Sequence, residues 1–154
     1  MKKQIISKNQ EETMNLAAEI AKKLHGGEVL ALTGELGGGK TTFTKGLAEA
    51  LKVEESITSP TFVMLKVYNA ILPPTNLQGS FKKVKLIHID AYRTETIEDI
   101  KSVGIEDYLN RDDVVMVIEW AEKIREILPK DTIDITFKFI DENIREITIH
   151  NLVV

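Results

Sequence analysis

The sequence predicts a single α/β domain over residues 1–154, with a central sheet flanked by helices. Three observations predict it. The short apolar run 28–33 leads through a glycine-rich stretch into an amphipathic segment, as in a strand–loop–helix unit. Residues 114–118 are five apolar residues in succession, typical of a buried parallel strand. Apolar and polar residues alternate along 133–149 around a polar turn at 141–143, which predicts a C-terminal β-hairpin.

Composition limits the class of protein before any motif is considered. The 154 residues are 43% hydrophobic and 29% charged, as in a soluble globular domain with a substantial core. The chain has no cysteine, which excludes disulfides and thiolate zinc sites, and its three histidines have no metal-ligand spacing. With a formal charge of -4, the protein is not expected to attract nucleic acid by its overall field. No apolar run reaches membrane-spanning length, so we expect a cytoplasmic protein with no membrane contact.

The first segment contains a short strand at 4–6 and then a helix. Ser7 and Gln10 have the spacing of a capping box, and acidic residues follow in the first turn. The helix leads to the strand at 28–33. The turn at Ser7–Gln10 is either a plain helix cap or a border of the nucleotide-base site discussed next.

The segment Gly34–Thr42 fits G-x-x-x-x-G-K-[ST], a phosphate-binding loop. Glycines let backbone N–H groups converge on a phosphate, and the following helix adds its positive N-terminal end. Lys40 can reach the β- and γ-phosphates, and the Thr41 hydroxyl suits Mg²⁺. The alternative is a glycine-rich surface turn, but Phe43, Leu47 and Leu51 continue as an amphipathic helix. The predicted phosphate-contacting residues are Gly34, Leu36, Gly37, Gly38, Gly39, Lys40, Thr41 and Thr42, with Gln10 near the base.

A hydroxyl-rich loop at 54–62 follows the phosphate-loop helix, with Thr58, Ser59 and Thr61 around Pro60. Switch loops that sense a γ-phosphate lie at this position in such proteins, and Thr61 is our candidate sensor. A simple Ser-Pro turn explains the same residue types, so both interpretations stay open.

Two strands are predicted at 62–68 and 83–89, joined by a long exposed loop at 70–80 that contains two prolines. Lys82, Lys83 and Lys85 follow this loop. They either contact RNA or a partner, or protect a solvated strand edge.

Two acidic residues end predicted strands. Asp90 follows the strand at 83–89, and Glu119 follows the apolar run 114–118 in the Walker B pattern. We expect Glu119 to face Mg²⁺ together with Thr41, and Asp90 to orient water or act as a general base. Together with Lys40, these are the predicted catalytic groups. Short helical pieces are predicted to start at 96–99 and to cover 104–109 and 121–128.

The combination resembles the TsaE (YjeE) family, P-loop ATPases of tRNA threonylcarbamoyladenosine biosynthesis. The matching pieces are Leu36–Thr42, Ser59–Phe62, His88–Arg93, Gly104–Leu109 and Ile118–Trp120. The resemblance implies a P-loop NTPase-like three-layer fold with a mixed sheet. It also implies ATP, Mg²⁺ and a TsaB–TsaD partner complex, in which TsaD transfers the threonylcarbamoyl group to tRNA. The sequence differs from the family in its longer loop at 70–80 and in Gly38, where alanine is common.

Three alternative functions on the same fold each require particular sequence features. A small-molecule kinase needs an arginine-bearing lid, but Arg93 and Arg111 are the only arginines between the phosphate loop and Glu119. A GTPase would need D-x-x-G and N-K-x-D, which are missing. A nucleotide-dependent binding switch stays open. For the ATPase we expect slow hydrolysis by an isolated monomer, because the phosphate loop has no arginine. A cation would come from Arg93 or from the partner complex, and tRNA would be reached through that complex.

Overall fold

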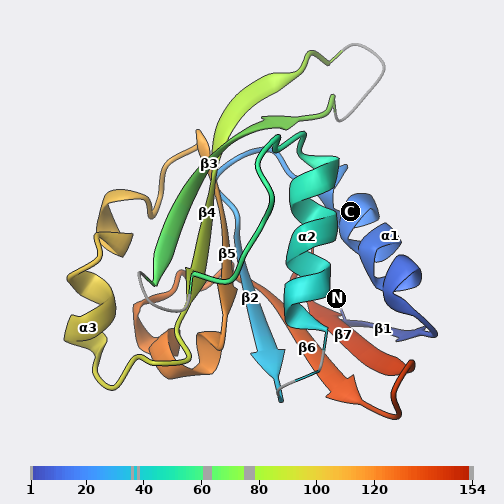
Figure 1. Cartoon of the computed structure of the whole chain (residues 1–154). Helices are drawn as coiled ribbons and strands as arrows, with labels where there is room; N and C mark the ends of the chain where they lie inside the picture. The colour runs from blue at the N-terminus through green and yellow to red at the C-terminus, as the bar shows by residue number, and fades with distance from the viewer. Residues whose placement is uncertain (1, 36, 38, 61–63, 75–78, 153–154) are drawn as a thin grey trace.

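The computed structural model describes residues 2–35, 37, 39–60, 64–74 and 79–152 of the chain. Seven strands form one sheet in the order β1-β7-β6-β2-β5-β4-β3 (Figure 1). The strands are β1 Lys2–Ser7, β2 Val29–Gly34, β3 Leu65–Leu72, β4 Lys82–Asp90, β5 Val114–Glu119, β6 Ile133–Phe139 and β7 Arg145–His150. The helices are α1 Gln10–Ala21, α2 Lys40–Ala50 and α3 Ile97–Lys101, with 3₁₀ helices η1 Ile105–Asp107 and η2 Ala121–Ile127.

The sheet is mixed, as predicted. Its centre is parallel, with β2 between β5 and β6 and with β4 beside β5. The additions at the two sides are antiparallel: β3 pairs with β4, β7 with β6, and β1 with β7. The predicted C-terminal hairpin is β6–β7, and Asp141 Oδ1 accepts the backbone N–H groups of Asn143 and Ile144 in its turn.

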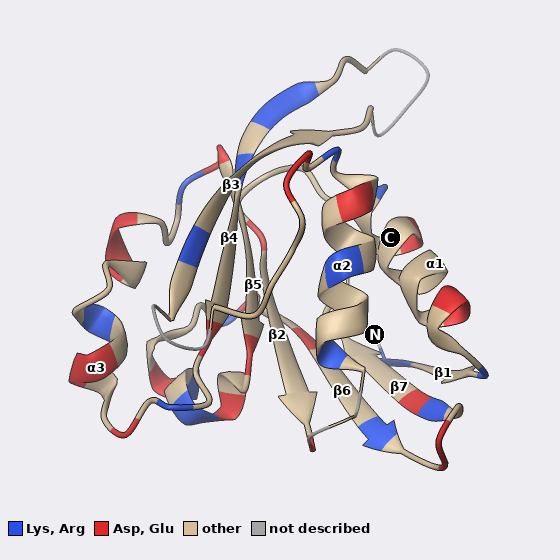
Figure 2. Cartoon of the chain, in the orientation of Figure 1, with Lys and Arg blue, Asp and Glu red and all other residues tan. Residues whose placement is uncertain are grey.

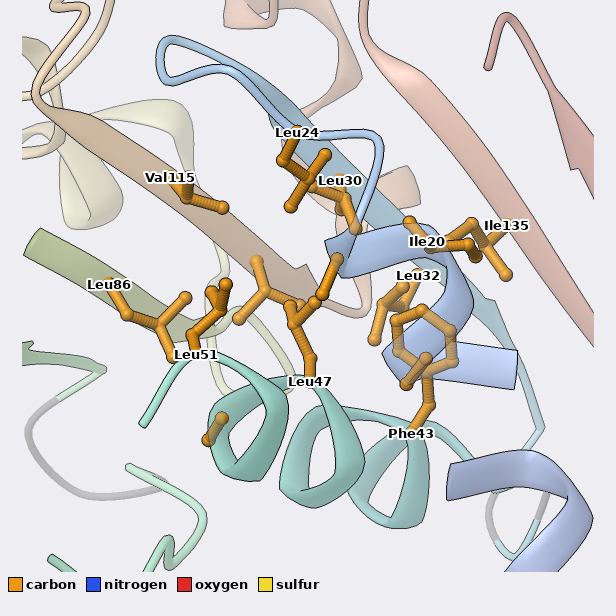
Figure 3. Close-up of a cluster of buried hydrophobic side chains, with 14 of the residues drawn as sticks. Ile20, Leu24, Leu30, Leu32, Phe43, Leu47, Leu51, Leu86, Val115 and Ile135 are labelled. Atoms are coloured by element: carbon orange, nitrogen blue, oxygen red, sulfur yellow. The ribbon is translucent and has the colours of Figure 1, made fainter. Parts of the chain in front are cut away.

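Helices cover both faces of the sheet, which completes the three layers. Helices α1 and α2 pack on one face (Figure 1), where Phe43 and Leu47 of α2, with Leu51 just after it, meet sheet residues such as Leu32, Leu86 and Ile135 (Figure 3). The shorter elements α3, η1 and η2 cover the parallel strands on the other face. Residues 114–118 are buried on both faces, which explains why this strand is uniformly apolar.

The α1–α2 contact is close because Gly46 has no side chain. A Cβ built on Gly46 would lie 2.6 Å from the Cα of Met14 on α1. The two backbones therefore approach one another at this point, and α1 is held directly beside the helix that starts at the phosphate loop.

Two local predictions need correction. The cap of α1 is Asn9, whose Oδ1 accepts the Glu12 N–H at 2.8 Å, and not the predicted Ser7–Gln10 pair. Ser7 still belongs to strand β1, where it pairs with Arg145, so it precedes the helix by too many residues. Its hydroxyl donates to Asn9 O and lies 2.6 Å from Thr13 Oγ1.

The second correction concerns the β3–β4 connection. Residues 70–72 belong to β3 and are not loop, because Ala70 and Leu72 are buried in the core. The backbone N–H of Ile71 also donates to Leu51 O. The connection therefore begins after Leu72, later than predicted, and β3 itself starts at Leu65 in the part of the chain that the structure describes.

Candidate nucleotide site

The site lies where the central parallel strands end. β4 ends at Asp90 and β5 at Glu119, and these two residues are direct neighbours in the strand register. Glu119 is also the neighbour of Leu32 on β2, whose chain continues into the glycine-rich loop. The sheet thus brings both predicted acids to the edge from which the loop and α2 begin, as the sequence predicted.

The loop backbone uses conformations that glycine permits. Gly34 has a φ of +139°, and a Cβ there would meet Phe137 O on β6 at 2.4 Å. Gly39, the residue before α2, has a φ of +100°. Leu36 and Gly38 lie outside the described residues.

Lys40 is the first residue of α2 and is buried, with 5% of its surface exposed. Its Nζ donates to Gly34 O at 2.6 Å and to Glu35 O at 2.9 Å, and it lies 4.3 Å from the centroid of the Trp120 ring. Burial lowers the pKa of Lys40 from its ordinary value, and the negative charge of Glu119 opposes this shift. The ammonium is held by neutral carbonyls and a ring, without a direct ion pair among the described residues.

Glu119 is the centre of a buried polar chain. Thr41 Oγ1 donates to Glu119 Oε1 at 2.8 Å, and His88 Nε2 donates to Glu119 Oε2 at 2.6 Å. His88 is fully buried, Glu119 is 3% exposed, and His88 Nδ1 has no partner among the described residues. Each oxygen of the carboxylate therefore has a hydrogen-bond partner, and the two bonds fix the orientation of the Glu119 side chain.

Asp90 lies next to Glu119 in the sheet but has different hydrogen-bond partners. Its Oδ2 accepts the Ser59 hydroxyl at 2.6 Å, and its Oδ1 accepts the Tyr92 N–H at 2.9 Å. Ser59 is part of the hydroxyl-rich loop, so this loop reaches the strand-end acid. Thr61, the predicted γ-phosphate sensor, lies outside the described residues.

One cavity of about 740 Å³ collects these groups. The predicted residues Gln10, Gly37, Gly39, Lys40, Thr41, Thr42, Asp90 and Glu119 line it, so Gln10 belongs to the site even though it does not cap its helix. The other lining residues are Asn9, Thr13, Ser59, Tyr92, Trp120, Glu142, Asn143 and Arg145. Arg93 is not among the described residues that line it.

Several residues of the site were not predicted from the sequence, among them an aromatic pair, a buried histidine and an arginine. The aromatic pair Tyr92 and Trp120, with ring centroids 5.0 Å apart, lies close behind the two acids: Ala91 separates Tyr92 from Asp90, and Trp120 follows Glu119 directly. Trp120 has a φ of 60°, a costly conformation for a bulky residue and one that concentrates at functional sites. The sequence could have indicated the aromatic pair, because both residues come shortly after an acid that ends a strand. It could also have indicated His88, because a histidine within an otherwise apolar strand is unusual. Arg145 has no local signal, because the loop that it contacts is 108 residues away.

Two of the three lysines that follow the β3–β4 connection make hydrogen bonds within the protein. Lys82 Nζ donates to Asp112 O at 2.8 Å and to His25 O at 3.3 Å. Lys85 Nζ donates to Asn69 Oδ1. Lys83 is exposed on β4, and positive residues are visible along this hairpin (Figure 2). Contact of these lysines with RNA or a partner stays a prediction, for which Lys83 is the best placed of the three.

The mixed sheet, with its glycine-rich loop between β2 and α2, defines a P-loop NTPase-like α/β protein. The chain belongs to the TsaE family: the model of the "Threonylcarbamoyl adenosine biosynthesis protein TsaE" matches residues 7–147. It is 40% identical to the tRNA threonylcarbamoyladenosine biosynthesis protein TsaE of Bacillus subtilis over 141 residues, which cover 91% of this chain and 80% of the relative.

Further comparisons agree with this membership. The TsaE of Treponema pallidum is 34% identical over 144 residues, covering 94% of this chain and 97% of the relative. The crystal structure of Bacillus subtilis YdiB superimposes with a TM-score of 0.72 and 34% identity, over 99% of this chain and 87% of that one. No helix among the described residues is long and apolar enough to cross a membrane.

Proposed function

We propose that this protein is a Mg²⁺-dependent ATPase that works with a TsaB–TsaD complex in forming the threonylcarbamoyl group on adenosine of tRNA. Membership of a family named for threonylcarbamoyl adenosine biosynthesis supports the pathway. The ATPase assignment has one main support: Lys40, Thr41, Asp90 and Glu119 line one cavity although they come from three separate segments of the chain. The shared cavity is the arrangement that phosphoryl transfer requires, because its catalysis consists mostly of positioning and charge neutralisation.

Within this proposal, Lys40 binds the phosphates. The only hydrogen bonds of its Nζ in the described chain are to the carbonyls of Gly34 and Glu35, so a phosphate oxygen can replace a weak neutral acceptor with a charged one. The lowered pKa of Lys40 reflects a cation held in a buried place without full compensation. A bound triphosphate supplies the missing negative charge.

The donor set near Lys40 fits Mg²⁺. Thr41 Oγ1 and Glu119 Oε1 are hard oxygen donors 2.8 Å apart. No cluster of three acidic or histidine residues suited to a metal occurs among the described residues. Mg²⁺ does not need one, since it usually keeps several waters and takes one or two protein ligands plus phosphate oxygens. Thr41 would bind the ion directly and Glu119 directly or through water, and the ion would neutralise charge that develops on the phosphates.

Asp90 is the proposed water-orienting group. It is 6% exposed and lines the cavity beside Glu119, but its carboxylate makes no contact with Thr41 or Lys40 among the described hydrogen bonds. Each of its oxygens instead accepts one described hydrogen bond, from Ser59 or from the Tyr92 N–H, and a carboxylate oxygen has a second lone pair that can accept another. An acid held apart from the metal-facing acid is available to accept a hydrogen bond from the attacking water.

Reconstitution of tRNA modification tests this proposal. Unmodified tRNA, a threonylcarbamoyl donor, TsaB, TsaD and Mg²⁺-ATP are incubated with the wild-type protein, with Lys40→Ala or with neither, and modified adenosine is measured by mass spectrometry. We expect repeated turnover only with the wild type. Equal modification in all three reactions would overturn the proposed role, and full activity of Lys40→Ala would overturn its ATPase basis.

A further inference from the structure

Arg145 joins the C-terminal hairpin to the phosphate loop. It is the first residue of β7, and its Nε donates to Gly37 O at 2.9 Å. Its Nη1 donates to Ile144 O at 3.1 Å and also to Asp141 O, both in the hairpin turn. One guanidinium therefore connects three backbone carbonyls, two on the hairpin and one on the loop.

Further contacts fix the orientation of this side chain. Its guanidinium carbon lies 4.6 Å from the centroid of the Phe139 ring on β6. A Cβ built on Gly39 would lie 3.8 Å from Arg145 Cγ, so the stem of the side chain packs against the residue that precedes α2. A planar donor group that stacks on a ring loses little further freedom for each hydrogen bond it makes.

The position of Gly37 gives the contact its importance. In a phosphate-binding loop the backbone N–H groups must point inward to the anion, so carbonyls that point outward need another partner. Gly37 has a φ of +77°, and a Cβ built on it would meet no atom within 4 Å, so no packing contact on that side of the residue holds the loop in place. Among the described residues, Arg145 is the side chain that binds this carbonyl.

We propose that Arg145 is a positioning residue that holds the phosphate loop in its anion-binding form from the C-terminal hairpin. This rests on the proposed nucleotide-binding function. The arrangement makes the last strand part of the nucleotide site: the hairpin braces the loop, and the cation adds positive potential to the cavity that it lines. Arg145 is thus a determinant of phosphate affinity that contacts the loop, whereas Lys40 contacts the phosphates.

The test measures binding of ATP, ADP and adenosine by calorimetry to wild type, Arg145→Ala, Arg145→Lys and the control Lys138→Ala. Lys138 is an exposed cation on the same hairpin. We expect Arg145→Ala to weaken ATP and ADP binding about tenfold or more, as for a lost charged hydrogen bond. Adenosine binding should change little, and Lys138→Ala should match the wild type. Arg145→Lys should recover only part of the loss, because an ammonium lacks the planar fork that connects the three carbonyls.

Hydrogen exchange of the nucleotide-free proteins gives the second measurement. Arg145→Ala should exchange faster in the peptide that covers the phosphate loop, while the peptides of α1 and β5 report an intact fold. Unchanged loop exchange together with unchanged ATP affinity would overturn the proposal. Full recovery by Arg145→Lys, or an equal loss in Lys138→Ala, would also overturn it by showing that charge alone matters. If the wild type itself does not bind ATP, the proposed function fails, which is a distinct result.

Discussion

Thr41 donates a hydrogen bond of 2.8 Å to Glu119, across 78 residues of sequence. The first lies at the start of α2 and the second at the end of β5, so this bond ties the phosphate loop to the strand that carries the acid. His88 donates to the other oxygen of the same carboxylate. The protein thus places an oriented, buried anion beside the residue expected to hold Mg²⁺, before any ion is bound.

Glu119→Gln should reduce Mg²⁺-dependent ATP hydrolysis by about 100-fold or more, because the substitution removes a preorganised charge but retains the shape of the side chain. ATP binding without Mg²⁺ should fall less. Single-turnover hydrolysis and calorimetry measure the two effects, and Glu126→Gln, at an exposed acid on η2, is the matched control. Equal metal dependence in Glu119→Gln and the wild type would remove Glu119 from the metal site.

Lys40→Met should abolish detectable ATP binding, a loss of about 100-fold or more for a charged contact. The same change should leave the nucleotide-free protein at least as stable as the wild type at neutral pH, because the buried ammonium is disfavoured there. Thermal unfolding with and without ATP tests both parts, with Lys45→Met as the exposed control on the same helix. A normal ATP-induced rise in Tm for Lys40→Met would contradict the phosphate-loop assignment.

The lowered pKa of Lys40 also predicts a pH dependence of stability. Below its folded-state pKa, Lys40 is protonated in both states, and the folded protein bears the full cost of the buried cation. Between that pKa and the ordinary value of 10.5, the unfolded chain binds more protons, so this contribution to stability rises with pH. Urea unfolding across the alkaline range measures the free energy of unfolding of the nucleotide-free wild type and of Lys40→Met. The wild-type value minus the Lys40→Met value should rise with pH. A flat or falling difference would contradict the lowered pKa.

Ser59 links the hydroxyl-rich loop to Asp90, and we expect this link to respond to the nucleotide. The loop should be more protected from hydrogen exchange with a non-hydrolysable triphosphate than with ADP, as in a γ-phosphate switch. Ser59→Ala should raise amide exchange at residues 58 and 59 in the nucleotide-free protein, whereas Ser56→Ala, which removes a hydroxyl nearby in the chain, should not. Equal protection in the triphosphate and diphosphate states would indicate a static Ser-Pro turn.

The sequence predicted those parts of the fold whose signal is local. The apolar run 114–118 and the alternation at 133–149 identified β5 and the hairpin, and the strand-end position of Asp90 and Glu119 placed both acids in the cavity. Local signals failed where several residues competed for one role. Ser7, Asn9 and Gln10 all suit a helix start, and only the pairing of Ser7 in β1 selects Asn9.

Contacts between distant segments could not be predicted in the same way. The extension of β3 depends on the core that receives Ala70 and Leu72, and it shortened the loop expected at 70–80. Arg145 reaches Gly37 only because β7 lies beside β6 and β6 beside β2. Lys82 was a candidate for RNA contact from its charge, but the fold gives it two backbone carbonyls as partners.

The last prediction concerns gating by partners. The isolated protein should hydrolyse ATP slowly, since phosphoryl transfer needs positive charge at the transition state beyond Lys40 and Mg²⁺. An arginine that a partner protein inserts into the site, an arginine finger, raises the rate about 10³–10⁵-fold where one is used. Within the chain, Arg145 lines the cavity but donates to backbone carbonyls, and Arg93 is not among the described lining residues. We therefore expect the TsaB–TsaD complex to supply the missing charge, or the closure that excludes water.

Steady-state ATPase activity of the protein alone and with TsaB–TsaD measures this gating, and an Arg93→Ala variant is assayed in both conditions. The partner complex should raise the turnover of the wild type, and Arg93→Ala should retain that stimulation if the cation comes in trans. If TsaB–TsaD stimulated the wild type but not Arg93→Ala, Arg93 itself would be the catalytic arginine. The partners would then act by aligning this residue. Fast turnover by the isolated wild type, unchanged when the partners are added, would refute gating and favour an autonomous ATPase or a kinase on this fold.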